Sequence, residues 1–206
     1  MLDHYIRTVF VNGFKAQIVG VSKEAAYRYK KAIDELLPKK IEEIEQQGNP
    51  QHIDIEQLRR MKVACIISSG DVNEDSHLKQ YTNDAANELI VDGFKAPFGD
   101  KGLKGGDGNY GILVVTAMLL TGFDAPVEQV MYLDKKLTNH NLLQAITRVN
   151  RTCGANKHCG YVVDYIGITN HLKEALSDYV DDGRDEIIAT LRDKSADIDA
   201  LNTAYN

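Results

Sequence analysis

Three side chains suited to holding a phosphate group lie close together in residues 144–151. Gln144, Arg148 and Arg151 are spaced at i, i+4 and i+7, so one face of a helix would present all three. A guanidinium group carries a permanent charge and a planar fork of donors that matches phosphate oxygens. The spacing therefore predicts a phosphate-binding helix face.

The residues before this helix predict a turn that could approach the same anion. An apolar run at 111–116 and another at 128–133 predict two strands, and the tetrapeptide TGFD lies between them at 121–124. Gly122 would let the backbone come close to a ligand, and Asp124 would place a carboxylate beside it. We therefore expect the turn and the helix to form one site.

Four sequence blocks in a fixed order carry a family resemblance. They are TAMLLTGFD (116–124), YLDKKL (132–137), NLLQAITRVNRT (141–152) and GYVVDYIG (160–167). The first resembles motif V of superfamily 2 helicases, and QAITRVNR (144–151) resembles motif VI. Taken together the blocks resemble the motor (R) subunit of type I restriction enzymes, over residues from about Phe14 to about Ala175.

The resemblance implies roles for the residues of the predicted site. Arg148 and Arg151 would be catalytic arginine fingers that reach the γ-phosphate of an ATP held by another domain. Gln144, Gly122 and Asp124 would belong to the ATP-binding network, with Asp124 contacting the ribose or motif VI. A finger of this kind offsets the charge that develops during phosphoryl transfer.

The resemblance also implies contacts to DNA. Thr116 would give its hydroxyl to a DNA phosphate, and we expect Ser22 to be a second DNA-binding residue. Many relatives have aspartate after this threonine, whereas this chain has Ala117. We therefore expect no counterpart of that aspartate's role here.

The implied fold is an α/β RecA-like (P-loop NTPase-like) three-layer domain with a mostly parallel sheet. It would be the second motor lobe and cover residues 1–168, followed by an acidic helical segment at 169–206. The first lobe would bring the P-loop lysine and the Mg²⁺-binding acids, and neither that lobe's motifs nor a nuclease domain has a counterpart in these residues. We therefore expect a piece of an ATP- and Mg²⁺-dependent translocase that cleaves double-stranded DNA together with modification and specificity subunits.

Periodicity and turn residues predict strands alternating with helices, which favours a parallel sheet covered on both faces. Ser22 is a predicted N-cap, and Pro38 is predicted to end the helix that Ser22 begins, leaving 39–51 as an exposed connection. We expect residues 99–109 to form an exposed flexible hairpin or loop. The predicted helices are 2–11, 22–37, 52–61, 75–90 and 140–150, and the strands are 14–21, 63–69, 111–116, 128–133 and 160–165.

The charge is unevenly distributed along the chain. The net charge is −6, and residues 174–199 hold nine acids against three bases, which accounts for all of it. Residues 135–158 hold five lysines and arginines and no acid, which predicts a small basic surface. The three cysteines, the lack of a long apolar run and the lack of a signal-peptide pattern predict a cytoplasmic chain.

Four alternatives are weaker. A GxGxxG string at Gly106–Gly111 precedes a strand, whereas a dinucleotide fingerprint follows one. Cys153, Cys159 and His158 have the wrong spacing for zinc. Asp124 with Asp134 and Lys136 matches a permissive nuclease pattern. A RecA-like lobe could also serve as a non-catalytic interaction or regulatory module, which an ATP-binding lobe upstream in the full reading frame would exclude.

Overall fold

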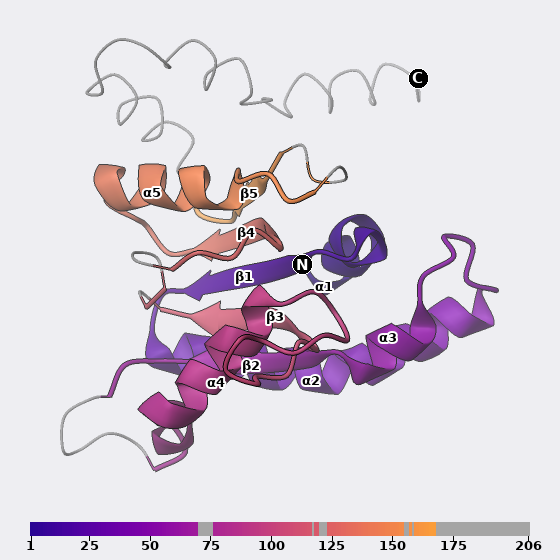
Figure 1. The fold of residues 1–206 in the computed structure, drawn as a ribbon, viewed down its shortest axis with the longest axis horizontal. Coiled ribbons are helices and arrows are strands. Elements are labelled where there is room, and N and C mark those ends of the chain that lie inside the picture. Colours follow the sequence, from indigo (N-terminus) through magenta and orange to yellow (C-terminus); the bar gives the residue numbers. More distant parts are fainter. Residues whose placement is uncertain (70–75, 117, 120–122, 155–156, 158, 168–206) are drawn as a thin grey trace, which may run out of the picture. The chain divides into compact units, whose positions relative to one another are not determined.

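The computed structural model describes residues 1–69, 76–116, 118–119, 123–154, 157 and 159–167. Within them five strands form one all-parallel sheet in the order β2-β3-β1-β4-β5, with β1 at its centre (Figure 1). The strands are β1 (Lys15–Gly20), β2 (Lys62–Ile66), β3 (Tyr110–Val115), β4 (Glu128–Asp134) and β5 (Tyr161–Asp164). The predicted α/β class with a parallel sheet is confirmed.

Helices cover both faces of the sheet, as predicted. One face packs on the N-terminal helical turns α1 (Leu2–His4), η1 (Tyr5–Val9) and η2 (Phe10–Asn12) and on α2 (Lys23–Gln46). Alternate β1 residues Ala16 and Ile18 belong to this core, together with the buried side chains of η1. The other face packs on α4 (Asp84–Lys95) and α5 (Asn139–Val149), while α3 (Ile55–Arg60) packs on α2 (Figure 1).

The prediction that Pro38 ends the second helix is wrong. The helix α2 passes through Pro38 and continues to Gln46, and the buried residues Ile33, Leu37, Ile41 and Ile44 keep one stripe across it. Proline inside a helix costs about 3 kcal/mol, but each buried isoleucine side chain returns roughly 1.5–3 kcal/mol. Burial beyond the proline therefore keeps the helix intact, and most of 39–51 is helical rather than a connection.

The helix predicted at 75–90 begins later and runs further. Among its described residues, 76–83 form turns, including a short 3₁₀ turn, η3 (Lys79–Tyr81). The helix α4 begins after Asn83, whose side chain accepts a hydrogen bond from Ala86 N at 2.9 Å. Asparagine caps a helix by this bond, so the N-cap rather than the apolar spacing sets the start.

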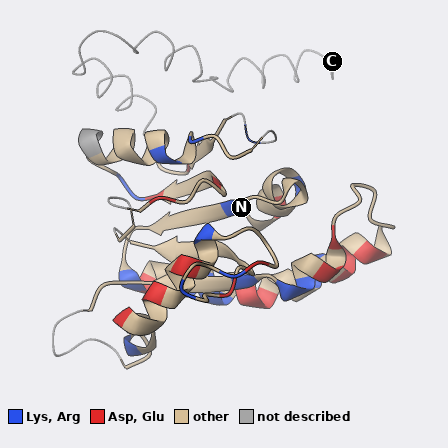
Figure 2. Ribbon diagram, viewed as in Figure 1, with Lys and Arg blue, Asp and Glu red and all other residues tan. Residues whose placement is uncertain are grey.

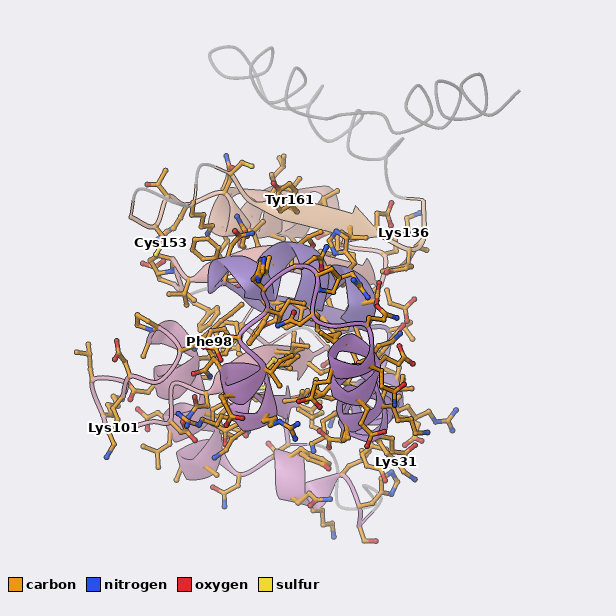
Figure 3. The ribbon with its side chains drawn as sticks, turned by 90° about the vertical axis from the view of Figure 1, so that its right-hand side faces the viewer. Lys31, Phe98, Lys101, Lys136, Cys153 and Tyr161 are labelled. Carbon is orange, nitrogen blue, oxygen red and sulfur yellow. The ribbon has the colours of Figure 1, made fainter. Side chains whose placement is uncertain are left out.

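The glycine-rich segment at 99–109 is packed against α4, and an antiparallel bridge between Lys101 and Asp107 joins its two arms, as in the predicted hairpin. The Asp92 carboxylate accepts hydrogen bonds from the backbone N–H groups of Lys104 and Gly106, at 2.8 and 3.0 Å. A Cβ added at Gly93 would lie 2.2 Å from the carbonyl oxygen of Asp107, so only glycine allows this approach. Figure 3 shows Lys101 projecting outward from this loop. The glycines therefore serve packing, which disfavours a dinucleotide site.

A buried lysine ties β1 to this region. Lys15 is fully buried, and its Nζ donates to the carbonyl oxygens of Gly93, Ala96 and Gly108 at 3.3, 2.6 and 2.8 Å. The ammonium also lies 5.0 Å from the ring centroid of Phe98, which Figure 3 labels. A cation at the end of a helix satisfies carbonyls that lack intrahelical donors. Lys15 thus joins the last turn of α4 and the glycine-rich loop to the sheet.

Candidate functional site

Residues that follow neighbouring strands meet at one edge of the sheet. Because the strands are parallel, their carboxyl ends lie together, and β1 and β3 are adjacent. Ser22 follows β1 and Thr116 follows β3, while Lys135 follows β4 and donates from Nζ to the Thr116 carbonyl at 3.3 Å. The structure brings the two predicted DNA-binding residues to the same edge.

Ser22 and Thr116 differ in how much of each side chain is available. Ser22 is exposed, and its hydroxyl accepts a hydrogen bond from Ala25 N at 3.1 Å, which confirms the predicted N-cap. Thr116 is buried, with 8% of its surface exposed. Ser22 therefore has a structural role whether or not it meets DNA, and the DNA contacts stay predictions.

Arg148 lies in the last turn of α5 and is half-buried. Its Nη1 donates to the carbonyl oxygen of Leu119 at 2.8 Å, which links the helix to the segment that precedes the TGFD turn. Burial lowers the pKa of Arg148, and the nearby Glu128 carboxyl opposes this shift. Part of the Arg148 side chain is therefore withdrawn from solvent by its contact with this segment.

Arg151 does not lie on the helix. The helix α5 ends at Val149, so the predicted single helical face for three residues fails at its last member. Arg151 instead makes an ion pair with Asp124, with Nη1 2.6 Å from Oδ2, and about half of each side chain is exposed. The turn and the end of the helix are thus brought together, as predicted, but through a residue in the following loop.

The structure says less about the two other predicted ATP-binding residues, Gln144 and Gly122. Gln144 is partly buried and lies one helical turn before Arg148. Gly122 lies outside the described residues. Figure 2 shows basic and acidic residues interspersed along α2, whereas α5 carries arginine and no acid. The corner formed by α5 and Asp124 therefore holds the half-buried Arg148 and the more exposed Arg151 in one neighbourhood, an arrangement suited to an anion.

Sequence reasoning missed two buried charges beside this corner. Glu128 begins β4 with 1% of its surface exposed, and Lys157 is also 1% exposed. Lys157 Nζ donates to the carbonyl of Pro126 at 2.8 Å and to that of Glu128. Burial raises the pKa of Glu128 to about 8, and the charges of Lys157 and Arg148 oppose that rise. An acid inside an apolar strand was the signal for this residue.

The other readings find no support in the described residues. Asp134 accepts a hydrogen bond from the Tyr29 hydroxyl at 2.8 Å, and Asp124 pairs with Arg151, so the two aspartates of the nuclease pattern have separate partners. His158 lies outside the described residues. Across the described part of the chain, no three His, Cys, Asp or Glu side chains gather as a metal site would need, and no helix is long and apolar enough to cross a membrane.

Several known proteins are similar to this chain. The MjaVIIP endonuclease subunit of Methanocaldococcus jannaschii, a putative type I restriction enzyme, is 35% identical over 176 residues, covering 81% of this chain and 14% of that protein. The HindI endonuclease subunit of Haemophilus influenzae is 49% identical over 71 residues, covering 33% of this chain and 7% of that protein. The chain thus spans a small part of these relatives.

A solved structure, the C-terminal part of the Fun30 ATPase domain, covers 84% of this chain and 42% of that chain, with 13% identity and a TM-score of 0.46. The model of one protein family, type I restriction enzyme subunit R domain 3, matches residues 12–167. That range includes all five strands and the corner of Arg148, Arg151 and Asp124. The chain belongs to the type I restriction enzyme R-subunit family, in which it corresponds to domain 3.

Proposed function

We propose that this chain is the second RecA-like lobe of an ATP-dependent DNA translocase within a type I restriction endonuclease subunit. It supplies Arg148 and Arg151 to an ATP site shared with a first lobe, and Ser22 and Thr116 to the DNA backbone. The observation that carries the proposal is that Arg151 pairs with Asp124, while Arg148 at the end of α5 is near enough for both of these groups to affect its pKa. Membership in the R-subunit family supports it, because relatives are endonuclease subunits.

The corner is chemically suited to a nucleotide. ATP with Mg²⁺ would supply the phosphoryl group and neutralise part of its charge. Arg151 is half-exposed and held by an exposed carboxylate, and a surface ion pair of this kind is worth roughly 0–1 kcal/mol. Arg151 can therefore exchange Asp124 for a phosphate oxygen at little cost. Arg148 donates to a neutral carbonyl, so it keeps most of its donors for the same anion.

The motor cycle follows from when these contacts form. The arginines gain phosphate contacts only when the two lobes close, and lose them after hydrolysis. Thr116 and Ser22 would hold DNA phosphates at the carboxyl edge of the sheet while the lobes move. Phosphate contacts carry no sequence information, as translocation requires, and recognition would belong to the specificity subunit. Mg²⁺ and the remaining ATP contacts are assigned to the first lobe, and the nuclease domain and modification subunit complete the complex.

The test is to replace each arginine in a full-length endonuclease subunit that carries this segment. Arg148→Ala or Arg151→Ala should slow ATP turnover by about 10³-fold or more, the scale of arginine fingers, with a much smaller loss of ATP affinity. Arg→Lys should rescue poorly, because an ammonium lacks the planar fork. Translocation and DNA cleavage should fall with turnover.

Arg59→Ala is the matched control. Arg59 is an exposed arginine on α3 that pairs with Glu45 at 2.7 Å, far from the corner in sequence, so turnover should stay normal. Thermal melts of this chain with each substitution separate loss of chemistry from loss of fold. Normal turnover in both corner variants would refute the arginine-finger proposal and favour a non-catalytic interaction or regulatory module.

A further inference from the structure

A buried carboxyl group without a hydrogen bond lies next to Arg148. Neither carboxyl oxygen of Glu128 has a hydrogen-bond partner among the described residues, although the residue is almost fully buried, with only 1% of its surface exposed. Buried carboxyl groups are normally hydrogen-bonded, because burying a charge without partners is costly. A residue kept in this state calls for a reason other than stability.

The register of the sheet sets where Glu128 lies. The β1–β4 ladder shifts between Lys15 and Ala16, so Lys15 pairs with Glu128 while Ala16 pairs with Val130. The shift leaves Gln129 as an extra residue, as in a β-bulge, a device that redirects a side chain. Lys15 packs against α4 on the face that α5 also covers, so its partner Glu128 starts β4 on the side of the sheet where Arg148 lies.

The charged neighbours of Glu128 differ in how firmly other hydrogen bonds hold them in place. The ammonium groups of Lys15 and Lys157 donate to backbone carbonyls. Arg148 is the neighbouring cation on α5, and the charges of Arg151 and Asp124 in turn affect its pKa. The thiol groups of Cys153 and Cys159, in the loop after α5, affect the pKa of Lys157. Of these cations, Arg148 is the half-exposed one that can move.

We propose that Glu128 is a positioning residue for Arg148, and that its carboxylate competes with the nucleotide phosphate for the Arg148 guanidinium. The inference rests on the proposed function of Arg148. In the open lobe, an ionised Glu128 draws Arg148 inward toward β4. When the phosphate takes the guanidinium, Glu128 loses a neighbouring positive charge and its ionised form becomes less stable. Its carboxylate then takes one proton from solvent and becomes a neutral carboxylic acid.

The pKa directions support this competition. Burial raises the pKa of Glu128 to about 8, while Lys157 and Arg148 lower it. Removing the influence of Arg148 raises it further, so nucleotide-driven closure is accompanied by proton uptake around and above pH 8, where Glu128 is ionised before closure. Above pH 8 most Glu128 is ionised and holds Arg148 against the phosphate. Turnover should therefore fall on the alkaline side.

The experiment compares the pH dependence of ATP turnover, at saturating ATP, in the full-length subunit and its Glu128→Gln variant. Wild-type kcat should fall about tenfold between pH 7 and pH 9, because roughly nine-tenths of a group with a pKa near 8 is ionised at pH 9. Glu128→Gln should keep a flat profile over this range. Glu88→Gln is the control, because Glu88 is an exposed acid on α4 paired with Lys104, and its profile should match wild type.

Each outcome separates this inference from the proposed function. If Arg148→Ala turns over normally, the proposed function fails and Glu128 has no finger to position. If Arg148→Ala is inactive but Glu128→Gln keeps the alkaline fall, only the Glu128 inference is refuted. A Glu128→Gln profile that is flat, with normal kcat at pH 7, supports it, because loss of a purely structural contact would lower activity at every pH.

The same inference can be tested on this chain alone by an NMR titration, which does not require ATP turnover. The NMR signal of the Arg148 Nε–Hε group should shift with pH around a midpoint near 8, reporting the ionisation of Glu128. The shift should vanish in Glu128→Gln and persist in Glu88→Gln. An Arg148 signal that does not respond to pH between 6 and 9.5 in the wild-type chain would overturn the inference.

Discussion

Two buried ionisable side chains lie side by side on neighbouring strands, and they differ in how many hydrogen bonds they make. Lys15 on β1 pairs in register with Glu128 on β4. The Lys15 ammonium donates to three carbonyl groups, whereas no described group bonds the Glu128 carboxyl. A buried charge with every donor used holds structure together, while one without partners is a cost. We therefore call the surroundings of Lys15 the fixed half of this residue pair. The surroundings of Glu128, beside Arg148, are the responsive half, because their charge can change with pH and with ligand binding.

A large loss of stability should come from removing Lys15, the buried lysine whose donors are all used. Lys15→Met leaves the carbonyls of Gly93, Ala96 and Gly108 without their donor, and unsatisfied buried acceptors cost about 1–3 kcal/mol each. We expect the free energy of unfolding to fall by about 3–5 kcal/mol in urea denaturation. Lys62→Met is the control, because Lys62 is half-exposed and pairs with Asp107 at the surface. A loss as small as that of the control would contradict the assignment of Lys15 as the fixed half.

Glu128→Gln should have the opposite sign at alkaline pH. The folded pKa of Glu128, about 8, lies above its ordinary value of 4.5, so the native state holds the proton more tightly than the unfolded chain. Its contribution is complete below pH 4.5 and is lost as pH rises through 8. Glu128→Gln should therefore unfold with roughly 4–5 kcal/mol more free energy than wild type at pH 9, and with a difference below about 1 kcal/mol at pH 5. Equal stability at both pH values would remove the contrast with Lys15.

The smallest effect should distinguish the two arginines. Arg148→Ala loses a half-buried hydrogen bond to Leu119 O and should destabilise the chain by about 1–2 kcal/mol. Arg151→Ala loses only an exposed ion pair with Asp124 and should cost less than about 1 kcal/mol. Thermal melts of the two variants give this order. The reverse order would place Arg151 rather than Arg148 in the responsive half.

Local patterns in the sequence predicted most of the fold. The apolar runs at β1, β3 and β4 and the Ser22 cap depend on neighbouring residues, so all four were placed correctly. Pro38 misled because the benefit of burying Ile41 and Ile44 comes from packing that a local rule does not contain. The start of α4 was misplaced because Asn83, a cap residue, lay inside an apolar spacing that favoured a longer helix.

The candidate site was predicted less completely, for the same reason. Arg148 and Asp124 could be assigned from blocks that resemble a known family. Arg151 lies beyond the helix because α5 ends at Val149, and its partner Asp124 lies 27 positions earlier in the chain. Glu128 and Lys157 become meaningful only when β4 and the loop after α5 are side by side. Long-range partners of this kind have no signature in a single sequence.

The position of β1 at the centre of the sheet also sets the order in which the domain can fold. β1 is the first strand along the chain, but its two partners, β3 and β4, end at Val115 and Asp134. During synthesis, β1 therefore has both edges unpaired until Val115 has been made, 95 residues after Gly20, and one edge unpaired until Asp134, 114 residues after it. Pairings so distant in sequence make folding slow and leave apolar strand edges open to misassembly. The Lys15 contacts also require Gly93, Ala96 and Gly108, so the central strand becomes secure only late in folding.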